Sequence, residues 1–578
     1  MVRRTGAEIV WEMLQREGVD VVFGIPGGTI MHTYHSRKDY GIHHVLVRHE
    51  QSAAHAADGY ARASGRVGVA IATSGPGATN LVTGIATAMM DSSPIVCITG
   101  QVSTSALGTD AFQEADITGI TLPITKHNYL VTDVDELAAT IHDAFQIAHS
   151  GRPGPVHIDL PADVQRAETE FAPPESETTY MPRGAPAPAP NAIEKAVDMI
   201  GRARRPVILA GRGVLLSNAV EDLAAFSDKI DAPVAVTLLG KGAFSPSNLL
   251  HLGMMGMHGH ALANRAIQDA DLLIALGMRF DDRVTGNPAL YAPEARKIHI
   301  DIDATELNKL IKTDVAICAD LRQALAEIVV AVSETSHRDW VEQIEAWRAE
   351  SQVHETLNRS PDGTVPAPHI IDEIFAATGG EAVVVTDVGQ NQMWAAQYYS
   401  TESARLFLSS GGLGTMGFGL PAAIGAQLAR PDDEVWAIVG DGGFQMSLHE
   451  LATLVQEDLP IRIALLNNHS LGMVRQWQTM FYDGCYEATD LLNPDFVRLA
   501  EAYGVEARRA TSLDQTRTVL ADVQGHRGPV LIEFEVARVG EASHVYPIVP
   551  NGAALDAMIR RSPSAVGSAV GRSSWTEH

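Results

Sequence analysis

Two stretches of sequence decide the fold, Glu434-Val-Trp-Ala-Ile-Val-Gly-Asp-Gly-Gly-Phe444 and Pro460-Ile-Arg-Ile-Ala-Leu-Leu-Asn-Asn468. Each contains a short run of Val, Ile, Leu and Ala, which is typical of a strand buried on both faces of a sheet. A helix-like stretch at 448–456 separates the two runs. This order predicts a strand, helix, strand unit in an open parallel sheet.

Polar residues follow both predicted strands, Asp441 after the first and Asn468 after the second. Because ligands bind beyond the carboxyl ends of parallel strands, we expect the two side chains at one sheet edge. Their oxygens suit Mg²⁺, which proteins usually hold with one or two groups together with ligand phosphates. Gly442 and Gly443 are expected to let the backbone approach those phosphates. The alternative is an ordinary turn with a solvated aspartate.

Composition indicates a large protein of several domains. The 578 residues are enough for about three domains, each with its own core. A net charge of -27 with scattered Lys and Arg argues against binding to nucleic acid or to an anionic membrane surface. The three cysteines lie far apart, which indicates free thiols in a reducing, cytoplasmic compartment. No stretch is long and apolar enough to predict a membrane span.

The Gly-Asp-Gly and Asn-Asn pair resembles the diphosphate signature of thiamine diphosphate enzymes. Such an enzyme needs a carboxylic group beside the ring nitrogen N1' of the aminopyrimidine, and Arg48-His-Glu-Gln51 resembles the segment that supplies it. Glu50 follows an apolar run and precedes the small-residue stretch 52–57, so we expect it near a helix start and partly buried. Taken alone, a glutamate at this position is more often a helix cap or a surface charge.

Short Gly-rich and polar motifs recur along much of the chain. They include Ile25-Pro-Gly-Gly28, Thr73-Ser-Gly-Pro-Gly-Ala-Thr-Asn80, Gly108-Thr-Asp-Ala-Phe-Gln-Glu114, Gly256-Met-His-Gly259, Arg279-Phe-Asp-Asp-Arg-Val-Thr-Gly286, Gly411-Gly-Leu-Gly-Thr-Met-Gly417 and Leu471-Gly-Met-Val-Arg-Gln-Trp477. On these motifs the chain resembles the large catalytic subunit of the acetohydroxyacid synthase family. The resemblance implies decarboxylation of pyruvate on thiamine diphosphate. It also implies condensation of the hydroxyethyl enamine with a second pyruvate or 2-oxobutyrate, to give 2-acetolactate or 2-aceto-2-hydroxybutyrate for branched-chain amino acid synthesis.

The expected fold is α/β, with three doubly wound parallel-sheet domains. By resemblance they are a pyrimidine-binding, a central FAD-binding and a diphosphate-binding domain. Strands in the central domain are predicted at 206–210, 233–236, 271–276 and 297–301. The expected order is the first domain at 1–170, a Pro-rich linker at 171–190, the central domain at 191–348, a linker at 349–367, the third domain at 368–561 and a disordered tail at 562–578.

The resemblance assigns roles to residues around thiamine diphosphate and magnesium. Glu50 would drive formation of the reactive imino tautomer, Met416 would wedge the cofactor into a bent shape, and the Gly414 carbonyl would accept from its 4'-amino group. Residues around the diphosphate and the metal would be Gln390, Asp441, Gly442, Gly443, Asn468 and, through its carbonyl, Ser470.

The acceptor substrate is expected to meet Arg283 and Trp477. A planar guanidinium binds a carboxylate bidentately, although for an isolated Arg283 a surface ion pair with Asp281 or Asp282 is the more common explanation. Trp477 resembles the aromatic residue that favours 2-oxobutyrate by contact with its extra methyl group, although a lone Trp is usually a core residue. Further substrate positions by resemblance are Gly28, Phe112, Gln113 and Met257.

The resemblance also predicts FAD, in a structural role without net redox chemistry. The residues expected to line it are Gly211, Gly213, Thr237, Leu238, Met257, His258, Gly277, Arg279, Asp281, Arg283 and Asp301. Four positions depart from the family pattern, Ile25, Thr29, Lys241 and Asn391, and they put substrate and inhibitor preference in doubt.

Rival interpretations remain open. The nearest are another FAD-containing thiamine carboligase and a pyruvate oxidase, followed by a catalytically silent homologue. Gly412-Leu-Gly-Thr-Met-Gly417 also fits the pattern of a nicotinamide-binding turn, but a dehydrogenase leaves Asn467 and Asn468 without a purpose. As partners we expect a second copy of the chain, in a homodimer or homotetramer with active sites between subunits, and a possible small regulatory subunit.

Overall fold

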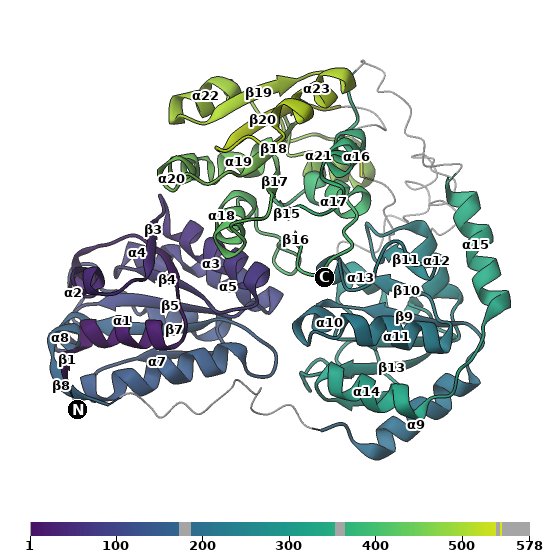
Figure 1. Cartoon of the computed structure of the whole chain (residues 1–578), viewed down its shortest axis with the longest axis horizontal. Helices are drawn as coiled ribbons and strands as arrows, with labels where there is room; N and C mark the ends of the chain where they lie inside the picture. The colour runs from purple at the N-terminus through teal and green to yellow at the C-terminus, as the bar shows by residue number, and fades with distance from the viewer. Residues whose placement is uncertain (1, 173–186, 353–363, 539–543, 546–578) are drawn as a thin grey trace.

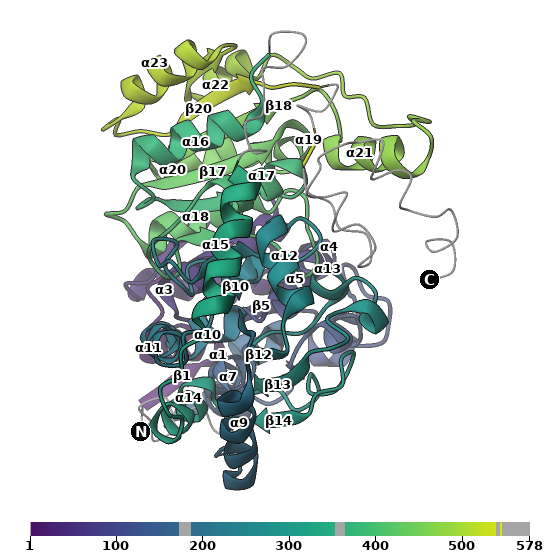
Figure 2. The ribbon, with the colours of Figure 1, turned by 90° about the vertical axis from the view of Figure 1, so that its right-hand side faces the viewer.

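The computed structural model describes residues 2–172, 187–352, 364–538 and 544–545. They form three α/β domains, each built on a six-stranded parallel sheet, which confirms the predicted fold class. In Figures 1 and 2 the third domain, green to yellow, lies above the other two. Most of both predicted linkers and all of the predicted tail at 562–578 lie outside the described residues. No described helix has the length and apolar character needed to cross a bilayer.

The first domain has strand order β3-β2-β4-β5-β7-β6. An unpredicted antiparallel pair, β1 (Val2–Thr5) with β8 (Glu168–Phe171), joins the two ends of the domain. The sheet strands are β2 (Val21–Gly24), β3 (His43–Leu46), β4 (Gly68–Ala72), β5 (Ile95–Gln101), β6 (His127–Leu130) and β7 (Val156–Pro161). Helices α1 (Gly6–Arg16) and α7 (Val134–His149) pack on one face, and α3 (Glu50–Ser64) and α5 (Val82–Asp91) on the other.

The third domain contains both stretches that opened the sequence analysis, and both form strands as predicted. Its order is β16-β15-β17-β18-β20-β19. The strands are β15 (Val383–Thr386), β16 (Phe407–Leu408), β17 (Val435–Gly440), β18 (Arg462–Asn467), β19 (Glu506–Ala510) and β20 (Val530–Glu535). Helices α16 (Ala367–Thr378), α17 (Gln390–Tyr398) and α23 (Leu513–Val523) pack on one face, and α18 (Gly419–Ala429), α20 (Leu451–Gln456) and α22 (Phe496–Tyr503) on the other.

The central domain has a different order, β11-β10-β9-β12-β13-β14. Counted in chain order this is 3-2-1-4-5-6, the arrangement of dinucleotide-binding sheets, whereas the first and third domains share the order 2-1-3-4-6-5. Four strands fall where they were predicted, and β11 and β14 were missed. The strands are β9 (Pro206–Ala210), β10 (Val234–Val236), β11 (His251–Met254), β12 (Leu272–Leu276), β13 (Arg296–Asp301) and β14 (Val315–Cys318). Helix α15 (Arg338–Gln352) runs past residue 348.

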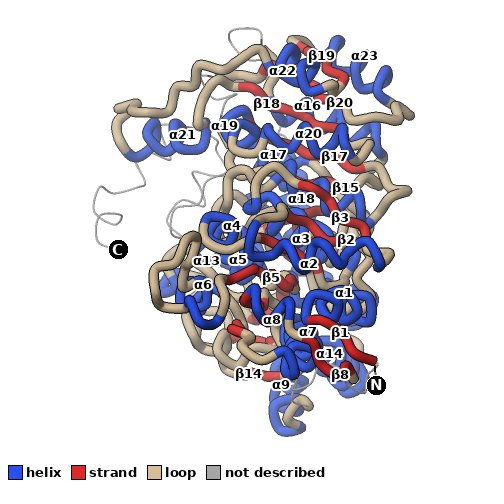
Figure 3. Tube along the Cα trace, turned by 90° about the vertical axis from the view of Figure 1, so that its left-hand side faces the viewer, coloured by secondary structure: helices blue, strands red, loops and turns tan. Residues whose placement is uncertain are grey.

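Helices α3 and α18 join the first and third domains into one apolar core (Figures 1 and 3). They touch at glycines: a Cβ on Gly59 would lie 2.0 Å from the Ala422 carbonyl oxygen, and one on Gly425 would lie 1.8 Å from that of Ala56. These two contacts make the helices antiparallel. Glu50, at the start of α3, therefore lies at the opposite end of the pair from Gly419, roughly 18 Å away along the axis.

A side chain at Gly425 is therefore expected to force the two domains apart. Gly425→Ala should destabilise the protein by about 1–3 kcal/mol, because neither helix backbone can yield without losing core contacts. The measurement is the midpoint of thermal denaturation.

The matched control is Gly201→Ala. Gly201 lies inside helix α9 (Pro190–Arg202), and a Cβ there meets nothing within 4 Å. This variant should be stabilised by about 0.5–1 kcal/mol, the usual gain from replacing a helical glycine. If Gly425→Ala melts at or above Gly201→Ala, the close contact of α3 and α18 is not a stabilising constraint.

Candidate active site

The predicted diphosphate edge forms where β17 and β18 lie side by side. Asp441 begins the short helix α19 (Asp441–Gln445) directly after β17, and its side chain is only 2% exposed. Asn468 follows β18, where its oxygen accepts from the Ser470 N–H at 3.1 Å and its amide donates to Gln390 at 3.2 Å. Four residues predicted from different segments, Gln390, Asp441, Asn468 and Ser470, thus occupy one sheet edge.

Asn493 completes this edge, and sequence reasoning missed it. Its amide donates to Asp441 Oδ2 at 2.7 Å and to Asn467 Oδ1 at 2.9 Å, and its oxygen accepts from Gln445 at 3.0 Å. Burial raises the pKa of the Asp441 carboxyl to about 6, and the bond from Asn493 acts in the opposite direction. Asn493 therefore orients Asp441 and leaves its other oxygen, Oδ1, for a ligand.

The donor set fits magnesium. One buried carboxylate, one amide oxygen and one backbone carbonyl are hard oxygen ligands, and phosphates and water normally supply the remainder. Within the described residues, no group of three or more His, Cys, Asp and Glu side chains converges as a soft or multi-carboxylate metal site would require.

Asp387 supports the loop that carries Gly414 and Met416. It is fully buried and accepts from the Gly417 N–H at 3.0 Å and from the Gly419 N–H at 2.9 Å. A Cβ on Gly443 would lie 2.0 Å from its carboxylate, so close packing on Asp387 already requires that glycine. The sequence explains a glycine at 443 only by close approach of the backbone to a phosphate, and the structure adds this packing contact as a second reason.

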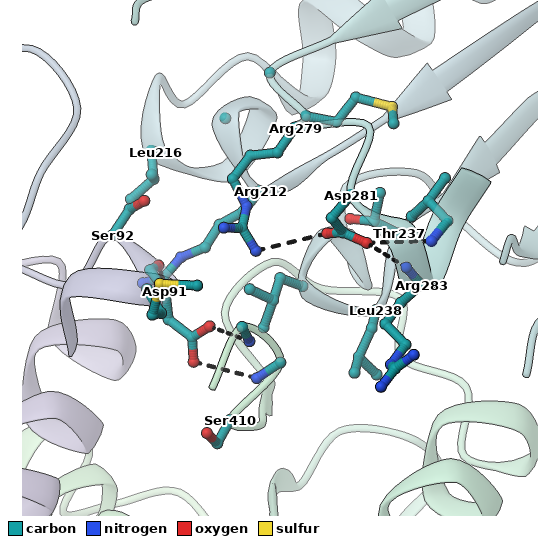
Figure 4. Close-up of a pocket in the computed structure, with 18 of the residues that line it drawn as sticks. Asp91, Ser92, Arg212, Leu216, Thr237, Leu238, Arg279, Asp281, Arg283 and Ser410 are labelled. Carbon is teal, nitrogen blue, oxygen red and sulfur yellow. Dashed lines mark hydrogen bonds and ion pairs between the residues drawn. The ribbon is translucent and has the colours of Figure 1, made fainter. Parts of the chain in front are cut away.

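A cavity of about 600 Å³ lies between the three domains (Figure 4). Nearly all residues predicted around FAD line it. Gly414, predicted at the thiamine, and Trp477, predicted at the acceptor substrate, line it as well. The lining includes Gly213, Thr237, Leu238, Met257, His258, Gly277, Arg279, Asp281, Arg283, Asp301, Gly414 and Trp477. The remaining predicted FAD residue, Gly211, packs beneath the cavity, where a Cβ would lie 2.2 Å from the Gly277 carbonyl oxygen.

The cavity opens at the switch point of the central sheet, where β9 and β12 end next to each other. Gly213 and Gly277 touch there, with a Cβ on Gly213 only 2.6 Å from the Gly277 Cα, and Gly277 has a φ of 57°. Dinucleotides bind at this place in sheets of this order. His258 Nδ1 is buried in the described structure without a hydrogen-bond partner. Burial and, next, Arg283 lower the pKa of His258 to about 4, so the ring is neutral, and the cavity suits a large aromatic cofactor with polar edges.

Arg283 and Trp477 meet at this cavity, with the guanidinium carbon 5.9 Å from the indole ring centre. Asp281 caps helix α13 (Asp282–Thr285) by accepting from the Arg283 N–H at 3.0 Å. The predicted alternative of an ion pair is also observed, since Arg283 lies 3.1 Å from Asp282. Because the Arg283 side chain is 55% exposed, this pair is weak and leaves the guanidinium open to a carboxylate.

Asp91, in the first domain, holds the Gly411–Gly414 loop against the cavity, and sequence reasoning missed it as well. Its carboxylate accepts from the Gly412 N–H at 2.6 Å and from the Gly411 N–H at 3.2 Å (Figure 4). Arg62 approaches the same carboxylate at 2.7 Å and also binds Asp58. All three charged side chains are buried, so the loop is fixed by a charge network without free members.

Glu50 and three predicted substrate residues lie on the first domain, outside the lining of the large cavity. Glu50 is 9% exposed at the start of α3 and accepts from Asn80 at 2.9 Å, as its predicted place near a helix start requires. Gln113, with a φ of 60°, packs against Gly75 in the adjacent turn. Phe112 is 87% exposed, and Gly28 meets nothing within 4 Å of a Cβ position. None of these four residues lines the large cavity.

Within one chain the predicted catalytic set is therefore divided. Gly419 donates to Asp387, and Asp387 touches Gly443, so the Asp441 edge lies at the amino-terminal end of α18. Glu50 lies at the other end of the α3 and α18 pair. Within one chain, Glu50 and the Asp441 edge thus lie at opposite ends of this helix pair.

Three of the positions that depart from the family pattern have structural partners. Asn391 donates to the Ile438 carbonyl at 3.0 Å beneath the Asp441 edge. Thr29 Oγ1 lies 3.0 Å from Thr73 Oγ1. Lys241 donates to the Ala396 carbonyl at 2.8 Å, at the carboxyl end of α17.

Comparison with known proteins shows the family to which the chain belongs. Three models of thiamine pyrophosphate enzymes match in order: the N-terminal TPP binding domain at 4–120, the central domain at 193–328 and the C-terminal TPP binding domain at 387–534. The acetolactate synthase large subunit of Corynebacterium glutamicum is 47% identical, over 95% of this chain and 89% of its own length. Acetolactate synthase isozyme 2 large subunit of Escherichia coli is 45% identical, over 96% of this chain and 99% of its own. The chain belongs to the thiamine pyrophosphate enzymes, in the family of acetolactate synthase large subunits.

Proposed function

We propose that this chain is the catalytic subunit of an acetolactate synthase that serves branched-chain amino acid synthesis. It decarboxylates one pyruvate and joins the two-carbon fragment to a second pyruvate or to 2-oxobutyrate. The observation that carries the proposal is the meeting of Arg283 and Trp477 beside Gly414 in one cavity. A cation for a carboxylate next to an indole for a short alkyl group is what a 2-oxo acid acceptor requires.

Each protein group has a defined task in this proposal. Thiamine diphosphate, when bound, supplies the carbanion chemistry that carbon–carbon bond cleavage and formation require. The Glu50 carboxyl would hydrogen-bond the aminopyrimidine of this cofactor, and Asp441, Asn468 and the Ser470 carbonyl would hold magnesium at its diphosphate. Arg283 binds the acceptor carboxylate, and Trp477 contacts its alkyl group. The large cavity would hold FAD, and its lining residues Arg283 and Trp477 would form the acceptor end of the site.

We also propose a homodimer in which Glu50 of one copy faces Asp441 of the other. The division of these residues within one chain supports it, because a second copy could supply the missing half of each site. The names of the Corynebacterium and Escherichia relatives as large subunits support a small partner subunit. A cytoplasmic location is supported by free thiols at Cys97, Cys318 and Cys485.

A product assay tests the proposed reaction against its rivals. The purified chain receives pyruvate, thiamine diphosphate, magnesium and FAD, with and without 2-oxobutyrate, and all products are measured. The proposal requires acetohydroxy acids. Hydrogen peroxide with acetyl phosphate or acetate would indicate a pyruvate oxidase, acetaldehyde a simple decarboxylase, and no product a silent homologue.

Mixing two inactive variants tests the shared site. Glu50→Gln and Asp441→Ala should each abolish turnover, because each removes one half of every site. After subunit exchange, half of the dimers combine the two variants, and each mixed dimer has one site with both native residues. The mixture should recover about a quarter of the native activity.

A site built within one chain gives the opposite outcome, because every chain in the mixture carries one lesion and no activity returns. The control is a mixture of Glu50→Gln with itself, which stays inactive in both cases. Circular dichroism of each variant confirms that the fold is retained.

Trp477→Leu should reduce the preference for 2-oxobutyrate over pyruvate roughly tenfold or more, since contact with one methylene contributes about 1–3 kcal/mol. The measurement is the ratio of the two acetohydroxy acids when both acceptors compete. Arg283→Lys serves as the control, because the carboxylate is common to both acceptors and its weaker binding should leave the ratio unchanged. An unchanged ratio in Trp477→Leu would remove the proposed role.

Asn493→Ala should weaken magnesium binding about 10–100-fold, because Asp441 loses the hydrogen bond that orients it. Magnesium is titrated in the presence of thiamine diphosphate, and the change in tryptophan fluorescence is followed instead of turnover. FAD affinity is the internal control and should not change, since Asn493 lies outside the flavin cavity. An unchanged magnesium midpoint would reduce Asn493 to a packing residue.

A further inference from the structure

A second cavity, of about 250 Å³, lies where the central and third domains meet. We call it the Lys241 pocket, after a lining that includes Lys241, Phe244, His251, His260, Arg348 and Thr401. It shares only Met254 with the flavin cavity. Nothing in the proposed reaction uses it.

Lys241 brings an uncompensated charge to this pocket. Its ammonium donates to the Ala396 carbonyl and lies 5.1 Å from the centre of the Phe407 ring. An ammonium has three N–H donors, so this carbonyl satisfies only one of them. Burial lowers the pKa of Lys241 to about 8, so it keeps its proton at neutral pH. Across the described chain no carboxylate forms an ion pair with it.

The other ionisable groups of the pocket do not supply a negative charge. Arg348 donates to the Leu249 carbonyl at 3.1 Å and to the His251 carbonyl at 3.0 Å, and its ion-pair partner Glu345 lies outside the lining. Burial, followed by Lys241, lowers the pKa of His251 to about 3 and that of His260 to about 4, so both rings are neutral. The described lining contains no Asp or Glu, so Lys241 has no counter-charge, whereas Arg348 is paired with Glu345 at 3.2 Å in a partly exposed ion pair.

Apolar side chains form other parts of the same lining. Phe244, Leu252 and Leu262 give it carbon surface, and Thr401 gives it a hydroxyl group. A bare inorganic anion would leave the carbon surface without a partner, whereas a short organic acid matches both parts of the lining. We propose that the Lys241 pocket binds a small organic carboxylate, with its anionic end between Lys241 and Arg348.

The pocket lies behind elements of the active site. Met254 donates to His260 at 3.0 Å, in the loop that carries Met257 and His258. On the third domain, Gln397 donates to the His258 carbonyl at 2.8 Å. A carboxylate bound here therefore joins the central domain to the carboxyl end of α17, and it should stabilise that contact by mass action.

Calorimetric titration with sodium butyrate tests the proposal at constant ionic strength in chloride buffer. All proteins carry Arg283→Ala, so that the acceptor site does not bind the probe. The parent chain should bind one butyrate per subunit and melt at a higher temperature in its presence. Lys241→Met, which keeps the length of the side chain without its charge, should lower the affinity at least tenfold, and Lys241→Arg should retain it. Equal butyrate affinity in Lys241→Met overturns the proposal. So does the absence of binding by the parent chain at butyrate concentrations up to about 50 mM.

Two further arms keep the test decisive. Sodium phosphate should bind more weakly than butyrate, and equal affinity would overturn the assignment to an organic acid. A crystal of the same Arg283→Ala chain soaked in 3-bromopropionate should show a bromine anomalous peak in the pocket. This arm needs no change at Lys241, so it decides the matter even if Lys241→Met does not fold, and an empty pocket overturns the proposal.

Discussion

The close antiparallel contact of α3 and α18 is the constraint on which the rest of the structure depends. Glycines at 59 and 425 bring the two backbones together, and the first and third domains then share one apolar core. The contact also determines where chemistry is possible, because it holds Glu50 and the Asp441 edge at opposite ends of the helix pair. In the proposed dimer, the partner copy supplies the half of the site that this interface places at the far end of the helix pair.

A buried network of charged side chains connects the central domain to the first and third domains. Arg62 and Arg212 approach Asp91 or its neighbours from the first and central domains, and the Asp91 carboxylate accepts from the backbone of the third. Buried ion pairs contribute little net stability, because desolvation offsets their attraction. Their effect here is geometric: they hold the Gly411–Gly414 loop beside the large cavity between the three domains.

Local patterns made much of this predictable. Apolar runs that end in Asp441 and Asn468 indicated neighbouring strand ends, and the structure places both residues at one edge. Asp91, Asp387 and Asn493 could not be found in the same way, because each acts through bonds to segments far away in the sequence. Strand order was equally hidden. It depends on how crossovers pass over a sheet, and the runs at 251–254 and 315–318 are short and lack clear alternation.

The shared strand order of the first and third domains gives the divided site a physical logic. In both parallel sheets the order in which strands are added reverses between the first and third strands. This leaves a crevice between β2 and β4 in the first domain and between β15 and β17 in the third. Asp441 follows β17 in the second crevice, and the turns with Gly28 and Thr73 follow β2 and β4 in the first. In the proposed dimer, each of the two domains supplies half of a site from the same point of the same topology. Two copies related by a twofold axis can bring a first-domain crevice against a third-domain crevice twice, and every half-site then has a partner.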